Sequence, residues 1–77
     1  MNNLKMIRIL KGLTQAEVAK ATGIDRRDYS KIEAGLKKPY PAWVARIETY
    51  FGVEIDFLLQ EVEIPKKVKE VIKNGKK

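Results

Sequence analysis

The amino-acid sequence predicts an all-α domain of five short helices, followed by a short sixth helix near the C-terminus. Residues 1–60 fall into short segments in which apolar residues recur at helical spacing and not in strand-like alternation. Each of the first four segments is followed by a glycine, which is typical of helix ends. These glycines are Gly12, Gly23, Gly35 and Gly52. A chain of 77 residues has room for one small core.

Polar residues mark the start of each of the first two helices. The first runs from about Asn3 to Lys11, with Asn3 as its N-cap. The second begins after Thr14, because Thr14 and Glu17 have the spacing of a capping box, and it ends before Gly23.

The third and fourth helices are bounded in a similar way. Asp25 is a favourable N-cap for a third helix that ends at Ala34. Pro41 suits the first turn of a fourth helix, which ends at Phe51 because a glycine follows.

The last part of the chain predicts two shorter helices. A fifth helix is expected over about residues 55–60, and a sixth over about residues 65–73, where apolar residues again have helical spacing. We therefore expect a domain over residues 1–60 and a basic tail with a short helix over residues 61–77.

The composition excludes several classes of function. The net charge of +6 permits nucleic acid or an anionic membrane as partner. Because Cys and His are absent, we expect no disulfide, no metal site, no cofactor and no triad catalysis. No paired carboxylates or activated nucleophile indicate an enzyme, and no small-molecule site is evident. No membrane-spanning run or signal peptide is present, so we expect a soluble cytoplasmic protein.

Residues 14–34 predict a helix-turn-helix. Only Gly23, Ile24 and Asp25 join the second and third helices, and so short a joint forces them to cross steeply. Gly23 supplies the positive φ of the turn. The residues spaced to fill the wedge between the helices are Val18, Ile24, Tyr29 and Ile32. The residues left on the outer face of the third helix are Arg26, Arg27, Ser30 and Lys31.

The segment LTQAEVAKATGIDRRDYSKIEAG resembles the helix-turn-helix of the Cro/phage-repressor-type (XRE) family, and the resemblance extends over residues 4–59. It includes the closing GVEIDFLL. Four positions depart from the usual pattern. Thr22 stands at an aliphatic position, Tyr29 at an Ile or Val, Pro41 at a Leu, and Glu54 at a Ser cap.

The resemblance implies a five-helix repressor-like domain whose third helix, residues 25–34, enters the major groove of double-stranded DNA. The implied base contacts are Arg26, Arg27 and Lys31. Their chemistry agrees with this role, because Arg and Lys bond the O6 and N7 acceptors of guanine. The alternative is that these cations are only solvated.

Phosphate contacts are expected beside these residues. The resemblance implies that Gln15 contacts a phosphate, and the same role is assigned to Ser30, Lys37 and Lys38. Solvated side chains remain the alternative. Asp28 caps the third helix, orients Arg26 or Arg27, or accepts a hydrogen bond from a cytosine amino group.

The resemblance also implies a partly buried ion pair between Arg8 and Glu33, which would link the first and third helices. This pair is expected to orient the third helix, and loss of one partner would strand a buried charge.

A second apolar face is expected on the first helix, formed by Met6, Ile9 and Leu10. The apolar residues of the tail are its candidate cover, either in the same chain or in a second chain. Those named for this packing are Val68, Val71 and Ile72. Because one recognition helix reads few base pairs, we expect a homodimer on a palindromic operator.

The leading hypothesis is a sequence-specific transcriptional regulator of repressor or controller type, bacterial or phage-encoded. Two alternatives stay open. One is the antitoxin of a toxin–antitoxin pair, and the other is a protein-interaction module that kept the fold without reading DNA.

Overall fold

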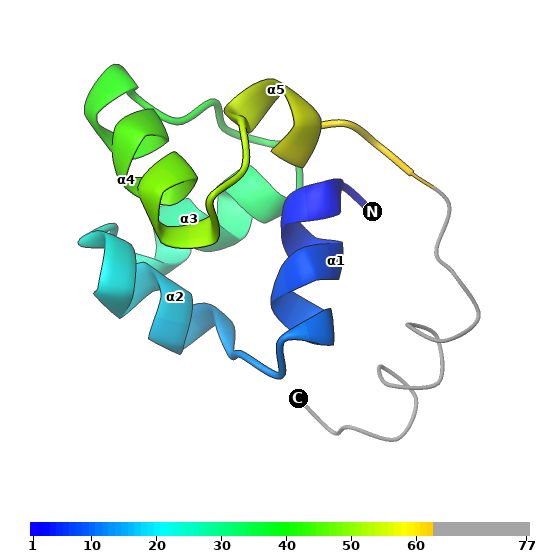
Figure 1. Ribbon diagram of the computed structural model, residues 1–77. Helices are drawn as coiled ribbons and strands as arrows, with labels where there is room; N and C mark the ends of the chain where they lie inside the picture. The colour runs from blue at the N-terminus through cyan, green and yellow to red at the C-terminus, as the bar shows by residue number, and fades with distance from the viewer. Residues whose placement is uncertain (63–77) are drawn as a thin grey trace.

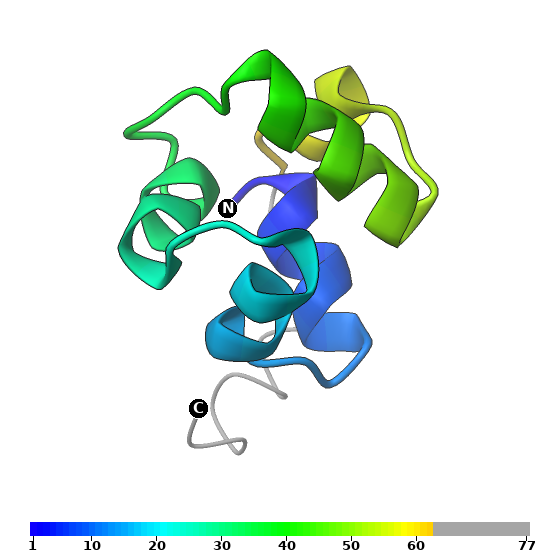
Figure 2. The same cartoon turned by 90° about the vertical axis from the view of Figure 1, so that its left-hand side faces the viewer.

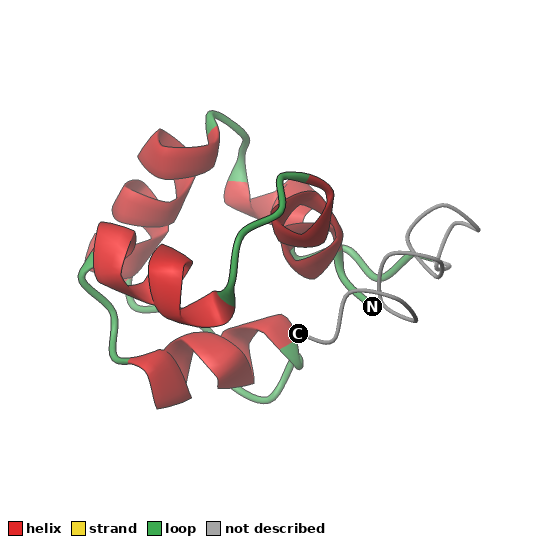
Figure 3. Ribbon diagram, turned by 90° about the horizontal axis from the view of Figure 1, so that it is seen from below, coloured by secondary structure: helices red, strands yellow, loops and turns green. Residues whose placement is uncertain are grey.

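The computed structural model describes residues 1–62 as a bundle of short helices (Figure 1). In chain order they are α1 (Asn3–Leu10), α2 (Gln15–Thr22), α3 (Arg26–Glu33), α4 (Pro41–Phe51) and α5 (Ile55–Leu58). Figure 3 shows helices joined by loops throughout this range. The all-α prediction with five helices is confirmed. The sixth helix predicted for residues 65–73 lies outside the described residues.

The start of α1 corrects one prediction. Its N-cap is Asn2 and not Asn3, because Asn2 has extended backbone and its side-chain oxygen accepts a hydrogen bond from the Lys5 amide at 3.0 Å. Asn3 is already helical, and its side-chain amide donates to the carbonyl of Phe57 at 2.9 Å. The two adjacent asparagines are equally good caps by sequence. The contact of Asn3 with α5 decides between them, because it leaves Asn2 as the cap.

The helix-turn-helix has the predicted caps. The Thr14 hydroxyl accepts from the Glu17 amide at 3.0 Å, while the Glu17 carboxylate accepts from the Thr14 amide at 2.7 Å. Gly23 ends α2 with φ 68°, in the left-handed region that lets the chain turn sharply. The Asp25 side chain then accepts from the Arg27 amide at 2.9 Å and starts α3.

The last two helices differ slightly from expectation. Pro41 opens α4 and Gly52 follows its end, as predicted. However, α5 spans only Ile55–Leu58, two residues shorter than expected. Its first amide, that of Ile55, donates to the Glu48 carboxylate of α4 at 2.8 Å. A side chain from the preceding helix therefore supplies the cap that Glu54 does not.

The core lies where α2 packs against α3 and α4, and where α1 and α4 pack against α5. Figure 2 shows α2 and α3 joined by their short connection, with α4 above them. The buried apolar residues are Leu4, Val18, Ala19, Ile24, Tyr29, Ile32, Ile47, Phe51 and Leu58. All four residues predicted to fill the wedge of the helix-turn-helix are among them.

The chain after α5 returns to the beginning of α1. The Asn3 amide donates to the Gln60 carbonyl at 3.0 Å, and the Val62 amide donates to the Met1 carbonyl at 2.8 Å. The Met1 ammonium lies 3.4 Å from the Glu61 carboxylate. The domain boundary at residue 60 stays a prediction, and the first residues of the predicted tail are bonded to the N-terminal residues.

Candidate nucleic-acid interface

The two sides of α3 differ sharply in burial. Tyr29, Ile32 and Glu33 are buried, whereas Arg26, Arg27 and Lys31 are exposed. Within residues 1–62, no ion pair joins these three cations to a carboxylate. The predicted base-contacting residues therefore lie together on the open side of the second helix of the pair, while Ser30 is half-buried beside them.

Two neighbouring lysines follow α3, and their surroundings differ. The ammonium of Lys37 lies 3.6 Å from the carboxylate of Asp28 and 5.2 Å from the centre of the Tyr40 ring. Burial lowers the pKa of Lys37, but the Asp28 carboxylate and Tyr40 outweigh it, so the pKa is raised. Lys38 is exposed and has no ion pair among the described residues. Asp28 thus pairs with Lys37 and not with the arginines beside it.

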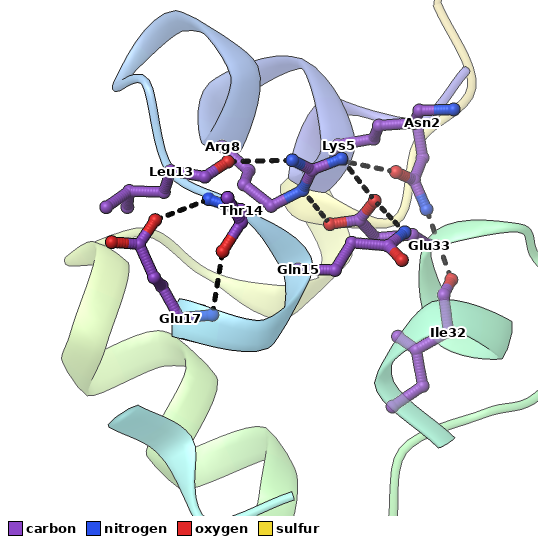
Figure 4. Close-up of polar contacts among 9 residues, drawn as sticks. All are labelled: Asn2, Lys5, Arg8, Leu13, Thr14, Gln15, Glu17, Ile32 and Glu33. Carbon is purple, nitrogen blue, oxygen red and sulfur yellow. Dashed lines mark hydrogen bonds and ion pairs between the residues drawn. The ribbon is translucent and has the colours of Figure 1, made fainter. Parts of the chain in front are cut away.

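A buried polar network lies behind the exposed face of α3 (Figure 4). The Arg8 guanidinium donates to the Glu33 carboxylate through Nε at 2.6 Å and through a terminal nitrogen at 3.1 Å. Its other terminal nitrogen donates to the Leu13 carbonyl at 2.8 Å. Such a fork-to-fork pair fixes orientation as well as distance. The structure thus brings together the two residues of the expected ion pair, at the end of α3.

Gln15 belongs to the same network. Its side-chain amide donates to the Glu33 carboxylate at 3.0 Å, so this side chain is half-buried and held in one orientation. One N–H of the amide is used by this bond, and a second remains for another acceptor. The phosphate contact of Gln15 stays a prediction, and the bond to Glu33 is an additional role that the sequence did not indicate.

Asn2 is a further buried residue, and the sequence did not predict its role. It is 1% exposed, and its side-chain amide donates to the carbonyl of Ile32 at 3.3 Å while its oxygen caps α1. The only signal in the sequence was a second asparagine next to the predicted cap. Asn2 therefore ties the start of α1 to the end of α3.

Tyr29 carries an unsatisfied polar atom into the core. Its side chain is fully buried, and its hydroxyl has no hydrogen-bond partner among the described residues. Burial, together with the negative charge of Glu33, raises the pKa of the Tyr29 hydroxyl. This is one of the positions that depart from the family pattern, which usually has an aliphatic residue here. Thr22, flagged for the same reason, is satisfied because its hydroxyl donates to the Val18 carbonyl at 2.8 Å.

The second apolar face is present on α1. Met6 and Ile9 are partly buried, and Leu10 is 47% exposed. The tail residues predicted to cover this face lie outside the described residues. These are Val68, Val71 and Ile72.

Two further observations concern residues 1–62. They contain no group of three or more His, Cys, Asp or Glu side chains that could hold a metal ion. None of the helices in this range is long and apolar enough to cross a membrane.

These features define a helix-turn-helix domain in which α3, the second helix of the motif, presents a basic, exposed face. The chain belongs to the helix-turn-helix family, because the family profile described as "Helix-turn-helix" matches residues 4–58. This agrees with the resemblance to XRE-type helix-turn-helix proteins found in the sequence.

Three relatives carry regulator names. The uncharacterized HTH-type transcriptional regulator YqaF of Bacillus subtilis is 39% identical to this chain over 59 residues. The match covers 77% of this chain and 78% of YqaF. An uncharacterized HTH-type transcriptional regulator of Methanocaldococcus jannaschii is 38% identical over 55 residues, which is 71% of this chain and 83% of that protein. The SPbeta prophage-derived regulator YonR of B. subtilis is 37% identical over 57 residues, 74% of this chain but only 53% of YonR. No solved structure matches the chain.

Changing Glu33 to Gln should destabilise the domain strongly. The substitution leaves the Arg8 charge buried without its partner, which typically costs about 3–5 kcal/mol. Urea unfolding followed by circular dichroism measures the loss. Asp28→Asn is the matched control, since it removes a carboxylate from the same helix at a half-exposed position. If the two variants were equally stable, the ion pair would not hold α3 in place.

Changing Tyr29 to Phe should leave stability at neutral pH unchanged or raise it, because the buried hydroxyl makes no hydrogen bond of good geometry within residues 1–62. The difference should depend on pH. The raised pKa keeps folded Tyr29 neutral while the unfolded side chain ionises above about pH 10, so only the wild type loses this part of its stability there.

Urea unfolding of both proteins at neutral and alkaline pH tests this prediction. The advantage of Tyr29→Phe should grow with pH. A variant that is much less stable at neutral pH would mean that the hydroxyl has a partner after all. Tyr29→Ala is the packing control and should cost about 3–5 kcal/mol.

Proposed function

We propose that this protein is a sequence-specific transcriptional regulator that binds double-stranded DNA with α3 in the major groove. The observation that carries the proposal is the exposed basic face of α3, where Arg26, Arg27 and Lys31 form no ion pair within residues 1–62. An arginine can bond guanine O6 and N7 with two hydrogen bonds, which is the commonest specific contact in the major groove.

The surroundings of this face support the same proposal. Gln15 lies at the N-terminal end of α2, where exposed N–H groups and the helix dipole favour an anion. Its side-chain orientation is fixed by Glu33, so its remaining N–H is available to a phosphate. Ser30, Lys37 and Lys38 lie next to the base-reading residues and are the other phosphate contacts we propose.

The relatives support a regulatory role. All three are named HTH-type transcriptional regulators, and two of them are matched over more than three quarters of their length. We propose a repressor or controller that works in the cytoplasm of a bacterium or from a phage genome, and no enzymatic activity. A domain over residues 1–60 would read DNA, and the basic tail over residues 61–77 would add nonspecific attraction.

The protein is proposed to act as a homodimer on a palindromic operator. A single α3 reaches only a few base pairs, and two copies related by a twofold axis read half-sites about 34 Å apart. The partly exposed face of Met6, Ile9 and Leu10 needs a cover, and a second chain can provide it.

Selection of bound sites from random duplex DNA, read together with the salt dependence of binding, tests the proposal directly. An enriched palindrome and a steep fall of affinity with salt are expected. Absence of enrichment would contradict sequence-specific binding and favour a protein-interaction module.

Changing Arg27 to Ala should cost about 1–3 kcal/mol of binding and relax the preference at one base position. Fluorescence anisotropy with the selected site and with single-base variants of it measures both effects. Lys38→Gln is the control, because loss of a phosphate contact weakens all sequences equally and lowers the salt slope by about 0.9. An equal loss on every sequence would instead make Arg27 a phosphate contact.

Removing residues 63–77 should convert the dimer to a monomer and weaken binding to the palindrome more than to a half-site. The deletion begins after Val62, so the bond between Val62 and Met1 is kept. Sedimentation equilibrium gives the mass, and Leu10→Ser tests the same face from α1. An unchanged mass and an unchanged operator affinity would exclude the tail from the interface.

A further inference from the structure

A half-buried ion pair lies between α3 and the loop that follows it. The Asp28 carboxylate and the Lys37 ammonium are 3.6 Å apart, and their side chains are 31% and 28% exposed. The ammonium also lies over two aromatic rings of the loop and α4, at 5.2 Å from the Tyr40 centroid and 5.9 Å from the Trp43 centroid. The two ring centroids are 4.5 Å apart. One cation is therefore held by an anion and two aromatic faces.

Lys38 provides a comparison within the same loop. It is exposed, and within residues 1–62 no carboxylate pairs with it. The two lysines have the same charge and adjacent positions, so sequence alone assigns them the same role. The structure separates them, because within residues 1–62 an anion lies at the ammonium of Lys37 and none lies at that of Lys38.

A carboxylate and a DNA phosphate compete for the same kind of partner. Lys37 can bond a phosphate fully only when it leaves Asp28. The charge of Asp28 also repels any phosphate that approaches within the Debye length of about 10 Å at 0.1 M salt. The aromatic contacts favour the position that Lys37 already occupies, because a cation over a ring face is attracted to it.

We propose that the Asp28 carboxylate is an intramolecular competitor for Lys37, which lowers the affinity of the protein for the phosphate backbone of duplex DNA. This inference rests on the proposed function, because it concerns the strength of the same DNA contact. Asp28 is then a positioning residue that acts through Lys37. It sets how tightly the domain binds DNA of any sequence, while the arginines of α3 read the bases.

The test is a set of substitutions analysed on two duplexes. Asp28→Asn, Lys37→Gln and Lys38→Gln are combined in pairs, and binding to a random-sequence duplex and to the selected site is measured by fluorescence anisotropy over a range of NaCl concentrations. Asp28→Asn keeps the size of the side chain, and the Asp25 cap of α3 is untouched. Circular dichroism melting shows that each variant is folded.

One released phosphate contact predicts the size of the effect. Asp28→Asn should steepen the slope of log affinity against log salt by about 0.9. The ratio of its affinity to that of the wild type should therefore be roughly eightfold larger at 0.1 M salt than at 1 M salt. The gain should be the same on both duplexes. It should vanish in the Lys37→Gln background and persist in the Lys38→Gln background.

Three outcomes overturn the inference. If Asp28→Asn binds no more tightly than the wild type, or more weakly, Asp28 does not compete for Lys37. If the gain persists without Lys37, the effect is general repulsion and not competition within the pair. If the wild type binds no duplex at any salt concentration, the proposed function fails, and this inference fails with it. The first two outcomes leave the proposed function intact.

Discussion

The position of α3 depends on the Glu33 carboxylate at its end. That group accepts from Arg8 of α1 and from Gln15 of α2, and the same arginine bonds the Leu13 carbonyl between those helices. Taking both charges out of water costs several kcal/mol per ion, and the charge-assisted hydrogen bonds offset this only while every partner is in place. The network is therefore a geometric constraint more than a source of stability: displacement of α3 leaves a buried charge unpaired.

The constraint acts on one end of α3 and leaves the other open. At the C-terminal end, Asn2 adds a hydrogen bond to the Ile32 carbonyl, so α1 and its N-cap residue hold this end through one side chain each. At the N-terminal end, the Gly23 turn and the Asp25 cap fix the backbone without covering it. Arg26 and Arg27 follow directly and are exposed. Because α3 is held at its C-terminal end and carries exposed side chains at its N-terminal end, it can present those side chains to a groove without losing its orientation.

Local rules in the sequence predicted most of the fold, because caps and glycines act within a few residues. The capping box of Thr14 and the turn at Gly23 follow from spacing alone. Contacts between distant residues were not predictable in this way. By sequence alone Asn2 and Asn3 are equally good N-caps, and the hydrogen bond from Asn3 to the Phe57 carbonyl distinguishes them. The cap of α5 is a second example, because Glu48 and Ile55 have a spacing that matches no local motif. At the candidate site the side chains facing outward were predictable from helical period. The pairing of Asp28 with Lys37 was not, because it depends on the path of a loop.

The arrangement of charge shows why burial matters to the proposed site. Residues 26–38 contain five basic and two acidic residues, a formal charge of +3. Glu33, however, is turned inward and compensated by Arg8, which lies outside this segment. Asp28 and Lys37 cancel each other. Of the five cations in residues 26–38, Arg26, Arg27, Lys31 and Lys38 are exposed and have no ion-pair partner within residues 1–62. The exposed surface of this segment is therefore more positive than its sequence indicates, because the buried ion pair removes an acid from it.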